Sequence, residues 1–265
     1  MRFVKYSSNG NDFLICHSHS HNDGSRPALA RSVCERHNGI GADGMVVLIP
    51  APRGAEYAYE WEFYNADGSS AKMCGNASRS VGHYAYIEGI AQKRHQFLSE
   101  VGLIGIELDE NDMTLVQSDL GKCKILKQNI SESNPYGVKS WDLLDSGVPH
   151  LVGFVSQESA LPDKKDTLLE HLRHKYDANI SLGFIQKDAI KYSTYERGVE
   201  DITQACGTGA IAVFAMALKF GLCEKSAILI PPSKDILHLR MNEDSHILFK
   251  GAVKRIAVCE WLLES

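Results

Sequence analysis

The stretch "CGTGAIAVFAMALKF", residues 206–220, predicts a helix that is apolar on nearly every side. The run opens with Gly-Thr-Gly directly after Cys206 and stops at Gly221, a residue type that commonly ends helices. A helix without a polar stripe must be buried all round. The neighbouring segments of the chain therefore have to wrap around it.

A second stretch, "MCGNASRSVGHYAY" at residues 73–86, repeats this arrangement. Cys74 precedes Gly-Asn there, and apolar residues recur at helical spacing over residues 75–90. Almost half of the chain separates the two cysteines, and no low-complexity linker lies between them. Two helices that are each entered from a loop through Cys-Gly predict two similar halves, in which strands enclose a central helix.

Most of the remaining chain consists of short alternating or β-branched segments with turn residues between them, which predicts strands. These segments are "FLICHS" (13–18), "GMVVLIP" (44–50), "YEWEFYN" (59–65), "LIGIELD" (103–109), "MTLVQSD" (113–119), "HLVGFVS" (150–156), "SLGFIQ" (181–186), "KYSTYER" (191–197), "AILIPP" (227–232) and "HILFKGAVKRIAV" (246–258). Two further helices are predicted over residues 27–37 and 162–176. The fold class is thus α/β of the α+β kind, with one domain over residues 1–114 and a second over 115–253. The last strand, residues 254–265, is expected to return to the first domain.

Composition and charge restrict the class of protein. The 265 residues are 44% hydrophobic and 23% charged, which is typical of a globular protein, and the net charge of -5 offers no basic face for nucleic acid or an anionic membrane. No apolar run reaches the roughly 18 residues of a membrane span, and the start lacks the features of a signal peptide. We therefore expect a cytoplasmic protein. Its seven cysteines form an odd set without a CxxC pair, which argues against a disulfide framework or a zinc site.

The two cysteines at the helix starts point to acid/base chemistry. A helix N-terminus stabilises a thiolate, and the glycine after each cysteine leaves backbone N–H groups open to an anion. A carboxylate held between two such helix starts would have Cys74 on one side of its α-carbon and Cys206 on the other. One thiolate could then remove the α-proton while the opposite thiol delivers another, which inverts the stereocentre without pyridoxal phosphate or metal. The alternative is that both cysteines are small buried hydrophobes.

A set of motifs also resembles the diaminopimelate epimerase family over nearly the whole chain. In order, they are "GNDF" (10–13), "GIGADG" (39–44), "FYNADGS" (63–69), "MCGN" (73–76), "GVPH" (147–150), "ANI" (178–180), "YERGVE" (195–200) and "ACGTGA" (205–210). The resemblance implies two pseudo-symmetric halves, each a curled and mostly antiparallel sheet around a central helix, with the active site in the cleft between them. It also implies a homodimer that interconverts LL- and meso-2,6-diaminopimelate without a cofactor, on the route to lysine and peptidoglycan.

The resemblance assigns roles to individual residues. Cys74 and Cys206 match the two acid/base residues. The positions whose backbone N–H groups hold the carboxylate at the reacting carbon are Gly75, Asn76, Gly207 and Thr208. The positions that bind the distal carboxylate are Asn65, Asn179 and Arg197. Glu196 matches the acid that meets an ammonium group, and Asn11 and His150 match other positions of the site.

Three positions depart from the family pattern. Ala77 stands in "MCGNASR" where glycine is usual, so it adds a methyl group near the first helix start. Val148 replaces an asparagine that often faces the substrate, and Gly44 stands where many members have glutamine. The cysteines and the Glu196-Arg197 pair are all retained.

Other functions remain open at this stage. A racemase of the same architecture could act on proline or histidine, although Asn65, Asn179 and Arg197 favour a substrate with a second carboxylate. Cys74 and Cys206 could instead form a regulatory disulfide, or the chain could be a non-catalytic amino-acid binding module. Glu196 and Arg197 could be an ordinary surface ion pair. His17, His19 and His21 alternate at strand spacing and could bind metal, but a polar surface loop is the preferred interpretation, so no metal site is predicted.

Overall fold

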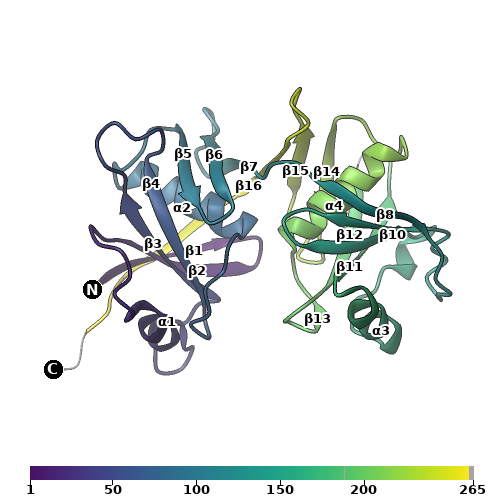
Figure 1. The fold of residues 1–265 in the computed structure, drawn as a ribbon, viewed down its shortest axis with the longest axis horizontal. Coiled ribbons are helices and arrows are strands. Elements are labelled where there is room, and N and C mark those ends of the chain that lie inside the picture. Colours follow the sequence, from purple (N-terminus) through teal and green to yellow (C-terminus); the bar gives the residue numbers. More distant parts are fainter. Residues whose placement is uncertain (188, 263–265) are drawn as a thin grey trace. The chain divides into compact units, whose positions relative to one another are not determined.

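The computed structural model describes residues 1–187 and 189–262 and divides the chain into two compact units. Unit 1 contains Met1–Asp119 and the C-terminal segment that starts at Gly251, whereas unit 2 contains Leu120–Lys250. In Figure 1 the segment that returns to unit 1 is drawn in yellow. Within the described residues, no helix combines the length and the apolar character that a membrane span requires.

Unit 1 is a curled sheet around one helix. Its strands are β1 (Arg2–Ser8), β2 (Asn11–His17), β3 (Gly44–Pro50), β4 (Tyr59–Asn65), β5 (Arg94–Ser99), β6 (Gly102–Leu108), β7 (Leu115–Asp119) and β17 (Lys254–Glu260). The pairs β1–β2, β3–β4, β5–β6 and β6–β7 are antiparallel, whereas β2–β3 and β4–β5 are parallel. β17 pairs antiparallel with the other side of β1.

Unit 2 follows the same order of pairings. Its strands are β8 (Lys124–Ile130), β9 (Trp141–Asp145), β10 (Pro149–Phe154), β11 (Asn179–Ile185), β12 (Ile190–Glu196), β13 (Asp201–Ile202), β14 (Ser226–Ile230), β15 (Leu237–Met241) and β16 (Ile247–Ala252), whose last two residues belong to unit 1. The pairs β9–β10, β11–β12, β14–β15 and β15–β16 are antiparallel, whereas β10–β11 and β12–β14 are parallel. β8 is added beside β9, and the short β13 lies beside β12.

Each parallel pair is bridged by a crossover that contains a helix, as parallel strands require. α1 (Arg26–Cys34) and α3 (Thr167–Tyr176) lie in the first crossover of their units. α2 (Gly75–Ile87) and α4 (Gly207–Lys219) lie in the second. The repeat predicted from the two Cys-Gly helix starts is therefore present in the topology, and the predicted fold class is confirmed.

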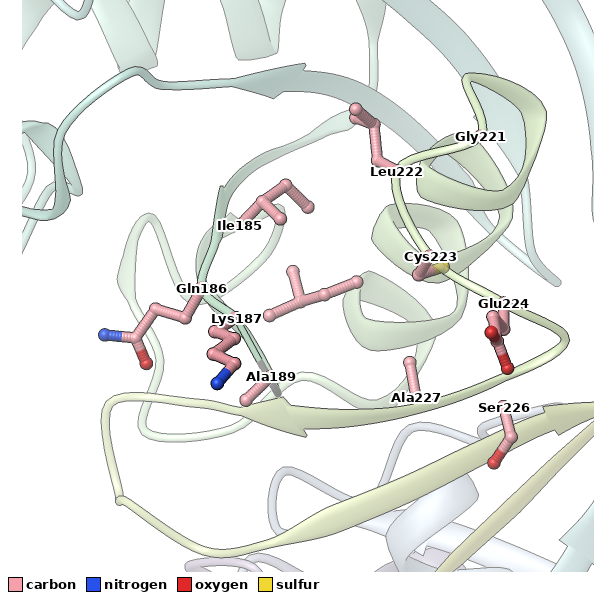
Figure 2. A pocket seen from close by; sticks show the side chains of 11 residues that line it. Ile185, Gln186, Lys187, Ala189, Gly221, Leu222, Cys223, Glu224, Ser226 and Ala227 are labelled. Carbon is pink, nitrogen blue, oxygen red and sulfur yellow. The ribbon is translucent and has the colours of Figure 1, made fainter.

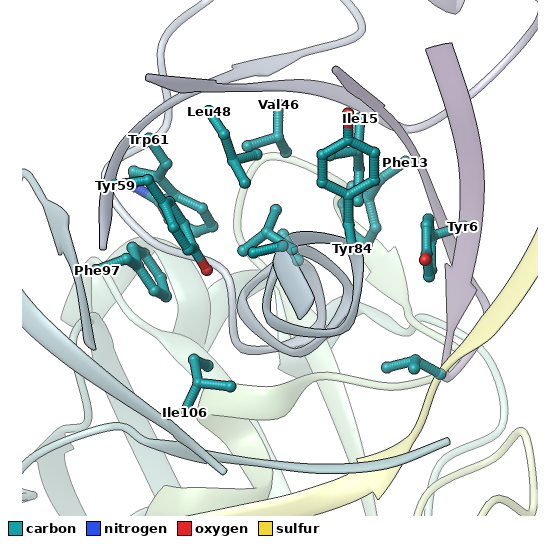
Figure 3. Packing of buried hydrophobic residues seen from close by; sticks show 14 of the residues in the cluster. Tyr6, Phe13, Ile15, Val46, Leu48, Tyr59, Trp61, Tyr84, Phe97 and Ile106 are labelled. Atoms are coloured by element: carbon teal, nitrogen blue, oxygen red, sulfur yellow. The ribbon is translucent and has the colours of Figure 1, made fainter. Parts of the chain in front are cut away.

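α2 and α4 are the central helices of their units. Figure 3 shows how aromatic and aliphatic side chains of the unit 1 strands, among them Phe13, Trp61 and Ile106, surround α2. α4 is buried from Gly209 to Phe214 without interruption, as its apolar sequence predicts. A burial of this extent is the main source of stability for a helix with so few polar side chains.

The two outer helices are shorter than predicted. α3 begins at Thr167 rather than at residue 162, because the carboxylate of Asp166 accepts the backbone N–H groups of Leu168 and Leu169, each at 2.9 Å. α1 ends at Cys34 rather than at residue 37, because Glu35 has extended backbone angles.

Candidate active site

Both cysteines cap the helices for which they were predicted. Cys74 precedes α2 with φ -149° and ψ 120°, and Cys206 precedes α4 with φ -117° and ψ 110°. Their carbonyl groups accept the first helical N–H groups, those of Ser78 at 2.9 Å and Ala210 at 3.0 Å. The first N–H groups of a helix have no backbone acceptor within that helix, which here applies to the residues directly after each cysteine. Each helix start can therefore bind an anion beside a sulfur atom.

Cys206 is held by the first turn of α4 and is buried. The N–H of Gly209 donates to its Sγ at 3.4 Å, and Oγ1 of Thr208 lies 3.4 Å from the same sulfur. Burial and the nearby Glu196 carboxylate raise the pKa of the Cys206 thiol well above its ordinary value, although Thr208 and Gly209 oppose this. The lowering expected from a helix N-terminus is thus outweighed at this cysteine, which is a thiol at neutral pH.

A hydrogen-bonded chain connects Thr208 to the neighbouring strands. Nε2 of His150 lies 3.0 Å from Oγ1 of Thr208 and 3.1 Å from Nδ2 of Asn179, whereas its Nδ1 lies 2.9 Å from Oγ of Ser181. The backbone N–H of Arg197 donates to Oδ1 of Asn179 at 2.7 Å, so the amide of Asn179 must present its NH₂ group to His150. Nε2 is therefore an acceptor, and the imidazole carries its proton on Nδ1.

His150 is neutral. Its side chain is completely buried, and burial together with the positive charge of Arg197 lowers its pKa to about 3. A neutral imidazole can accept a hydrogen bond from the Thr208 hydroxyl, which in turn contacts the sulfur of Cys206.

Glu196 and Arg197 do not form the surface ion pair considered from the sequence. Among the described residues, Nη1 of Arg197 pairs with Oδ2 of Asp177 at 3.0 Å and also donates to the Asp177 carbonyl at 3.1 Å. Glu196 turns the other way, toward Thr203 and Cys206, and burial raises the pKa of its carboxyl group. The two side chains thus serve different parts of unit 2.

Unit 1 holds a second group of the predicted residues. Nδ2 of Asn76, the second residue of α2 after Cys74, donates to Oδ1 of Asn11 at 2.6 Å. Asn65 lies apart from this group on the exposed end of β4, where its Nδ2 donates to Oγ of Ser69 at 3.0 Å.

The predicted residues are therefore divided between the two units, and in unit 1 Asn65 lies apart from the others. Unit 1 contains Asn11, Asn65, Cys74, Gly75 and Asn76. Unit 2 contains His150, Asn179, Glu196, Arg197, Cys206, Gly207 and Thr208.

Several polar residues that contact these groups were not predicted. Oγ of Ser146 donates to the Thr208 carbonyl at 2.9 Å, and the hydroxyl of Tyr192 donates to the Cys206 carbonyl at 3.0 Å. In unit 1, Asp43 and Arg79 bind the side chains of Asn11 and Asn76. Arg79 gives no signal of this role in the sequence, because an arginine within a helix ordinarily indicates a solvent face.

Two of the family departures have a structural explanation. A Cβ atom on Gly44 would lie 2.7 Å from Cε2 of Phe63 and 2.8 Å from the Tyr64 carbonyl, so the ring of Phe63 occupies the space of a larger side chain. Ala77 is completely buried within the core around α2, where its methyl group packs against apolar side chains. Val148 contributes its carbonyl to the N–H of Ser146 at 3.2 Å, and nothing in the structure explains its side chain.

The three histidines considered for metal binding do not share a strand face. β2 ends at His17, whose Nδ1 lies 2.8 Å from the Tyr84 hydroxyl, and His19 and His21 lie beyond the strand. Nδ1 of His21 is 3.6 Å from Oε1 of Glu62. Over the part of the chain that the structure describes, no three His, Cys, Asp or Glu side chains are placed to hold a metal ion.

A hollow of about 470 Å³ lies at the other end of α4, far along the helix from Cys206. Figure 2 shows its walls, in which Ile185, Gln186 and Lys187 stand opposite Cys223 and Glu224. None of the residues predicted for the site lines this hollow.

Two solved structures of low sequence identity have the same fold. A phenazine biosynthesis protein of the PhzF family from Enterococcus faecalis aligns with a TM-score of 0.76 at 13% identity, over 99% of this chain and 99% of that one. A probable proline racemase from Agrobacterium radiobacter, solved with bound carbonate, aligns with a TM-score of 0.73 at 13% identity, over 99% and 93%. The fold is thus the one that PhzF proteins and proline racemases share.

Sequence comparison narrows this class to one family. The diaminopimelate epimerase model matches residues 3–126 and 143–256. Diaminopimelate epimerases from Helicobacter pylori strain 26695 and Nitratiruptor sp. are 47% and 45% identical, over 97% of this chain and 95% and 96% of the relatives. The enzyme from Campylobacter lari is 38% identical over 96% of both chains. The chain therefore belongs to the diaminopimelate epimerase family, and the predicted resemblance and the assignment to the isomerases are confirmed.

Proposed function

We propose that this protein interconverts LL- and meso-2,6-diaminopimelate by a two-base mechanism that uses Cys74 and Cys206. The observation that carries the proposal is the repeated topology, which sets a Cys-Gly helix start at the same point of both units. The family membership and the small-molecule substrates of its named relatives support it.

The proposed reaction needs the two units to bind one substrate between them. The α-carboxylate is held by N–H groups of Gly75 and Asn76 from unit 1 and of Gly207 and Thr208 from unit 2. These donors stabilise the negative charge that develops when the α-proton leaves.

We propose that the two sulfurs exchange protons with the α-carbon from opposite sides. In one direction a Cys74 thiolate takes the α-proton and becomes a thiol, while the Cys206 thiol gives its proton to the opposite face of the carbanion. The raised pKa of Cys206 suits this sulfur to begin as the acid. The reverse direction exchanges the two roles, and no redox cofactor or electron acceptor is needed, because one C–H bond breaks as another forms.

The remaining predicted residues recognise the distal end of the substrate. We propose that Arg197, Asn179 and Asn65 bind the second carboxylate, with the guanidinium as the charged partner. Arg197 already pairs with a carboxylate, that of Asp177, whose side chain is largely exposed and can yield to a ligand. Glu196 then meets the ammonium group. A substrate such as proline has no second carboxylate for this set.

We further propose a cytoplasmic homodimer. Ile256 and Val258 lie on the same side of the edge strand β17 and are 47% and 54% exposed. An exposed apolar pair on an edge strand favours self-association. Sedimentation of the purified protein measures this directly.

The first test is incubation of the reduced protein with LL-diaminopimelate in heavy water. The wild type should incorporate deuterium at the α-carbon and form the meso isomer. Cys74→Ala and Cys206→Ala should both lose inversion by more than about 1,000-fold, because each removes one of the two proton carriers. Cys223→Ala is the matched control, since this cysteine lines the hollow at the opposite end of α4.

Each alternative has its own outcome. Inversion of proline or histidine but not of LL-diaminopimelate would identify a different racemase. Binding of the substrate without α-proton exchange, unchanged in both cysteine variants, would indicate a binding module. A protein that is inactive under all reducing conditions but forms a Cys74–Cys206 disulfide would be a redox protein.

A further inference from the structure

We propose that Asp43 and Arg79 are positioning residues that fix the side-chain amides of Asn11 and Asn76 as hydrogen-bond donors toward the substrate. This inference rests on the proposed function, but the hydrogen-bond chain behind it belongs to unit 1 alone. Neither Asp43 nor Arg79 touches the reacting carbon in the proposal.

The four side chains form one continuous chain of hydrogen bonds. Nδ2 of Asn11 donates to Oδ2 of Asp43 at 3.2 Å. Nδ2 of Asn76 donates to Oδ1 of Asn11 at 2.6 Å, and Nη2 of Arg79 donates to Oδ1 of Asn76 at 2.7 Å. All three bonds therefore run in the same direction, from the guanidinium toward the carboxylate.

The charged ends decide this direction. An ionised carboxylate can only accept hydrogen bonds, and a guanidinium can only donate them, whereas an amide can turn over and exchange its oxygen for its nitrogen. If Asn11 turned over, its oxygen would face the Asp43 carboxylate. If Asn76 turned over, its NH₂ group would face the Arg79 guanidinium. Each reversal would set two groups of the same kind against each other, so both amides are held in one orientation.

Both ends of the chain are themselves anchored. Oδ2 of Asp43 also accepts the backbone N–H of Asp12 at 3.0 Å, next to Asn11. Arg79 is completely buried and donates to the carbonyl of Gly75 at 3.1 Å and to Oγ of Ser8 at 3.0 Å. Gly251 leaves room for it, because a Cβ atom there would lie 3.2 Å from Nε of Arg79.

This orientation has a consequence for ligand binding. The NH₂ groups of Asn11 and Asn76 each use one hydrogen in the chain, which leaves each amide a second hydrogen of fixed direction. Together with the backbone N–H groups at the start of α2, they form a set of donors without an acceptor among them. Such a set is suited to a carboxylate and disfavours an ammonium group. It therefore determines that unit 1 accepts the carboxylate, rather than the ammonium group, of an amino acid.

The decisive experiment compares kinetics of Asp43→Asn, Arg79→Lys and Arg79→Met with the wild type, using LL-diaminopimelate. Asp43→Asn allows Asn11 to turn over, so KM should rise about tenfold while kcat changes less than about threefold. Arg79→Lys retains a donor-only cation and should bind more tightly than Arg79→Met. In the double variant Asp43→Asn/Arg79→Met, the losses should not add, because both changes release the same chain.

Arg36→Met is the matched control. Arg36 contacts the other carboxylate oxygen, Oδ1 of Asp43 at 2.7 Å, and its side chain is 55% exposed. Its removal should leave KM within about twofold. Thermal unfolding of every variant separates a loss of stability from a loss of positioning.

A second measurement tests the chain of hydrogen bonds in the absence of catalysis. In NMR spectra the side-chain NH₂ protons of Asn11 and Asn76 should exchange slowly with water, and Asp43→Asn should accelerate this exchange at least about tenfold. The inference is wrong if this exchange is unchanged, if an active wild type and Asp43→Asn share one KM, or if Arg79→Lys and Arg79→Met are equivalent. If the wild type shows the slow exchange but no turnover, the proposed function is wrong, whereas the inferred chain of hydrogen bonds through the two amides still holds.

Discussion

His150 holds neighbouring strands together through its hydrogen bonds and also makes the stability of the protein depend on pH. It is completely buried, accepts at Nε2 and donates at Nδ1, and its pKa is lowered to about 3. The folded protein therefore holds a neutral imidazole at every pH above that value. In the unfolded chain a histidine has a pKa near 6.5 and binds a proton as the pH falls.

This difference predicts a loss of stability in acid. His150 contributes fully above pH 6.5, and its contribution declines as the pH falls toward 3, because the unfolded state then binds a proton that the folded state does not. The free energy of unfolding should fall by about 2 kcal/mol between pH 7 and pH 5 from this residue alone. Urea unfolding of the wild type and of His150→Gln at both pH values measures it. Equal losses in the two proteins would show that His150 does not titrate in this way.

Cys206 shows where sequence reasoning at the residue scale ends. Its place at a helix N-terminus is visible in the sequence, and the macrodipole there lowers a thiol pKa. Its burial and the nearby Glu196 carboxylate are tertiary properties, and they raise the pKa instead. The position of a candidate catalytic group was thus predictable, whereas its protonation state depended on neighbours ten or more residues away.

At the scale of the element, Gly44 in β3 is a test of packing. A Cβ atom at this position would meet the ring of Phe63 and the Tyr64 carbonyl at less than 3 Å, so neighbouring β4 would have to shift. Gly44→Ala should destabilise the protein by about 1–3 kcal/mol, as overpacking of a core does. Thermal unfolding measures the change.

Gly105 in β6 provides the matched control. A Cβ atom there would approach only Cβ of Asp119, at 3.4 Å, which is an ordinary contact. Gly105→Ala should leave stability unchanged or raise it slightly, because glycine weakens the interior of a strand. If both substitutions had the same effect, the space around Gly44 would not be the reason for its glycine.

The elements that were predicted share a clear periodicity. α4 is apolar throughout, and β3 and β4 alternate or are wholly buried, so burial could be inferred from the residues themselves. β8, "KILKQNI", was not predicted, because six of its seven residues are exposed and carry no period-two pattern. Pairing with β9 places it in the sheet, and such long-range pairing leaves little trace in a local pattern.

α2 was predicted only in part, unlike the fully predicted α4 and the unpredicted β8. Its start after Cys74 was predicted, yet it buries Ser78, Arg79 and Ser80 completely at the centre of unit 1. Polar residues at these positions would ordinarily indicate a solvent face. Two of them bind groups around the candidate site: Ser78 and Arg79 both donate to the carbonyl of Gly75, and Arg79 also donates to the side chain of Asn76. Around the candidate site, these hydrogen bonds allow polar side chains to occupy buried positions of α2.

At the scale of the whole molecule, the two units repeat one topology but differ in continuity. Unit 2 is a single segment, whereas unit 1 needs β17, which the chain adds only after completing unit 2. β17 pairs with β1 in antiparallel register, so that Arg2 lies opposite Glu260. The backbone groups of Met1 and Trp261 exchange two hydrogen bonds of 2.7 Å at this end.

This geometry makes a rearranged unit 1 possible. Residues 251–262, joined by a short glycine linker in front of residues 1–119, would form a β-hairpin of β17 and β1 without any change in register. The rearranged fragment should unfold cooperatively and at least about 10 °C above the plain fragment 1–119, in which β1 is an unpaired edge. Circular dichroism during heating compares the two. The buried Val253 supplies an internal control, since Val253→Asp should remove the gain by placing a charge in the core around α2. If the plain fragment melted at the same temperature as the rearranged one, β17 would contribute nothing to unit 1, and the discontinuity of this unit would have to serve some purpose other than its stability.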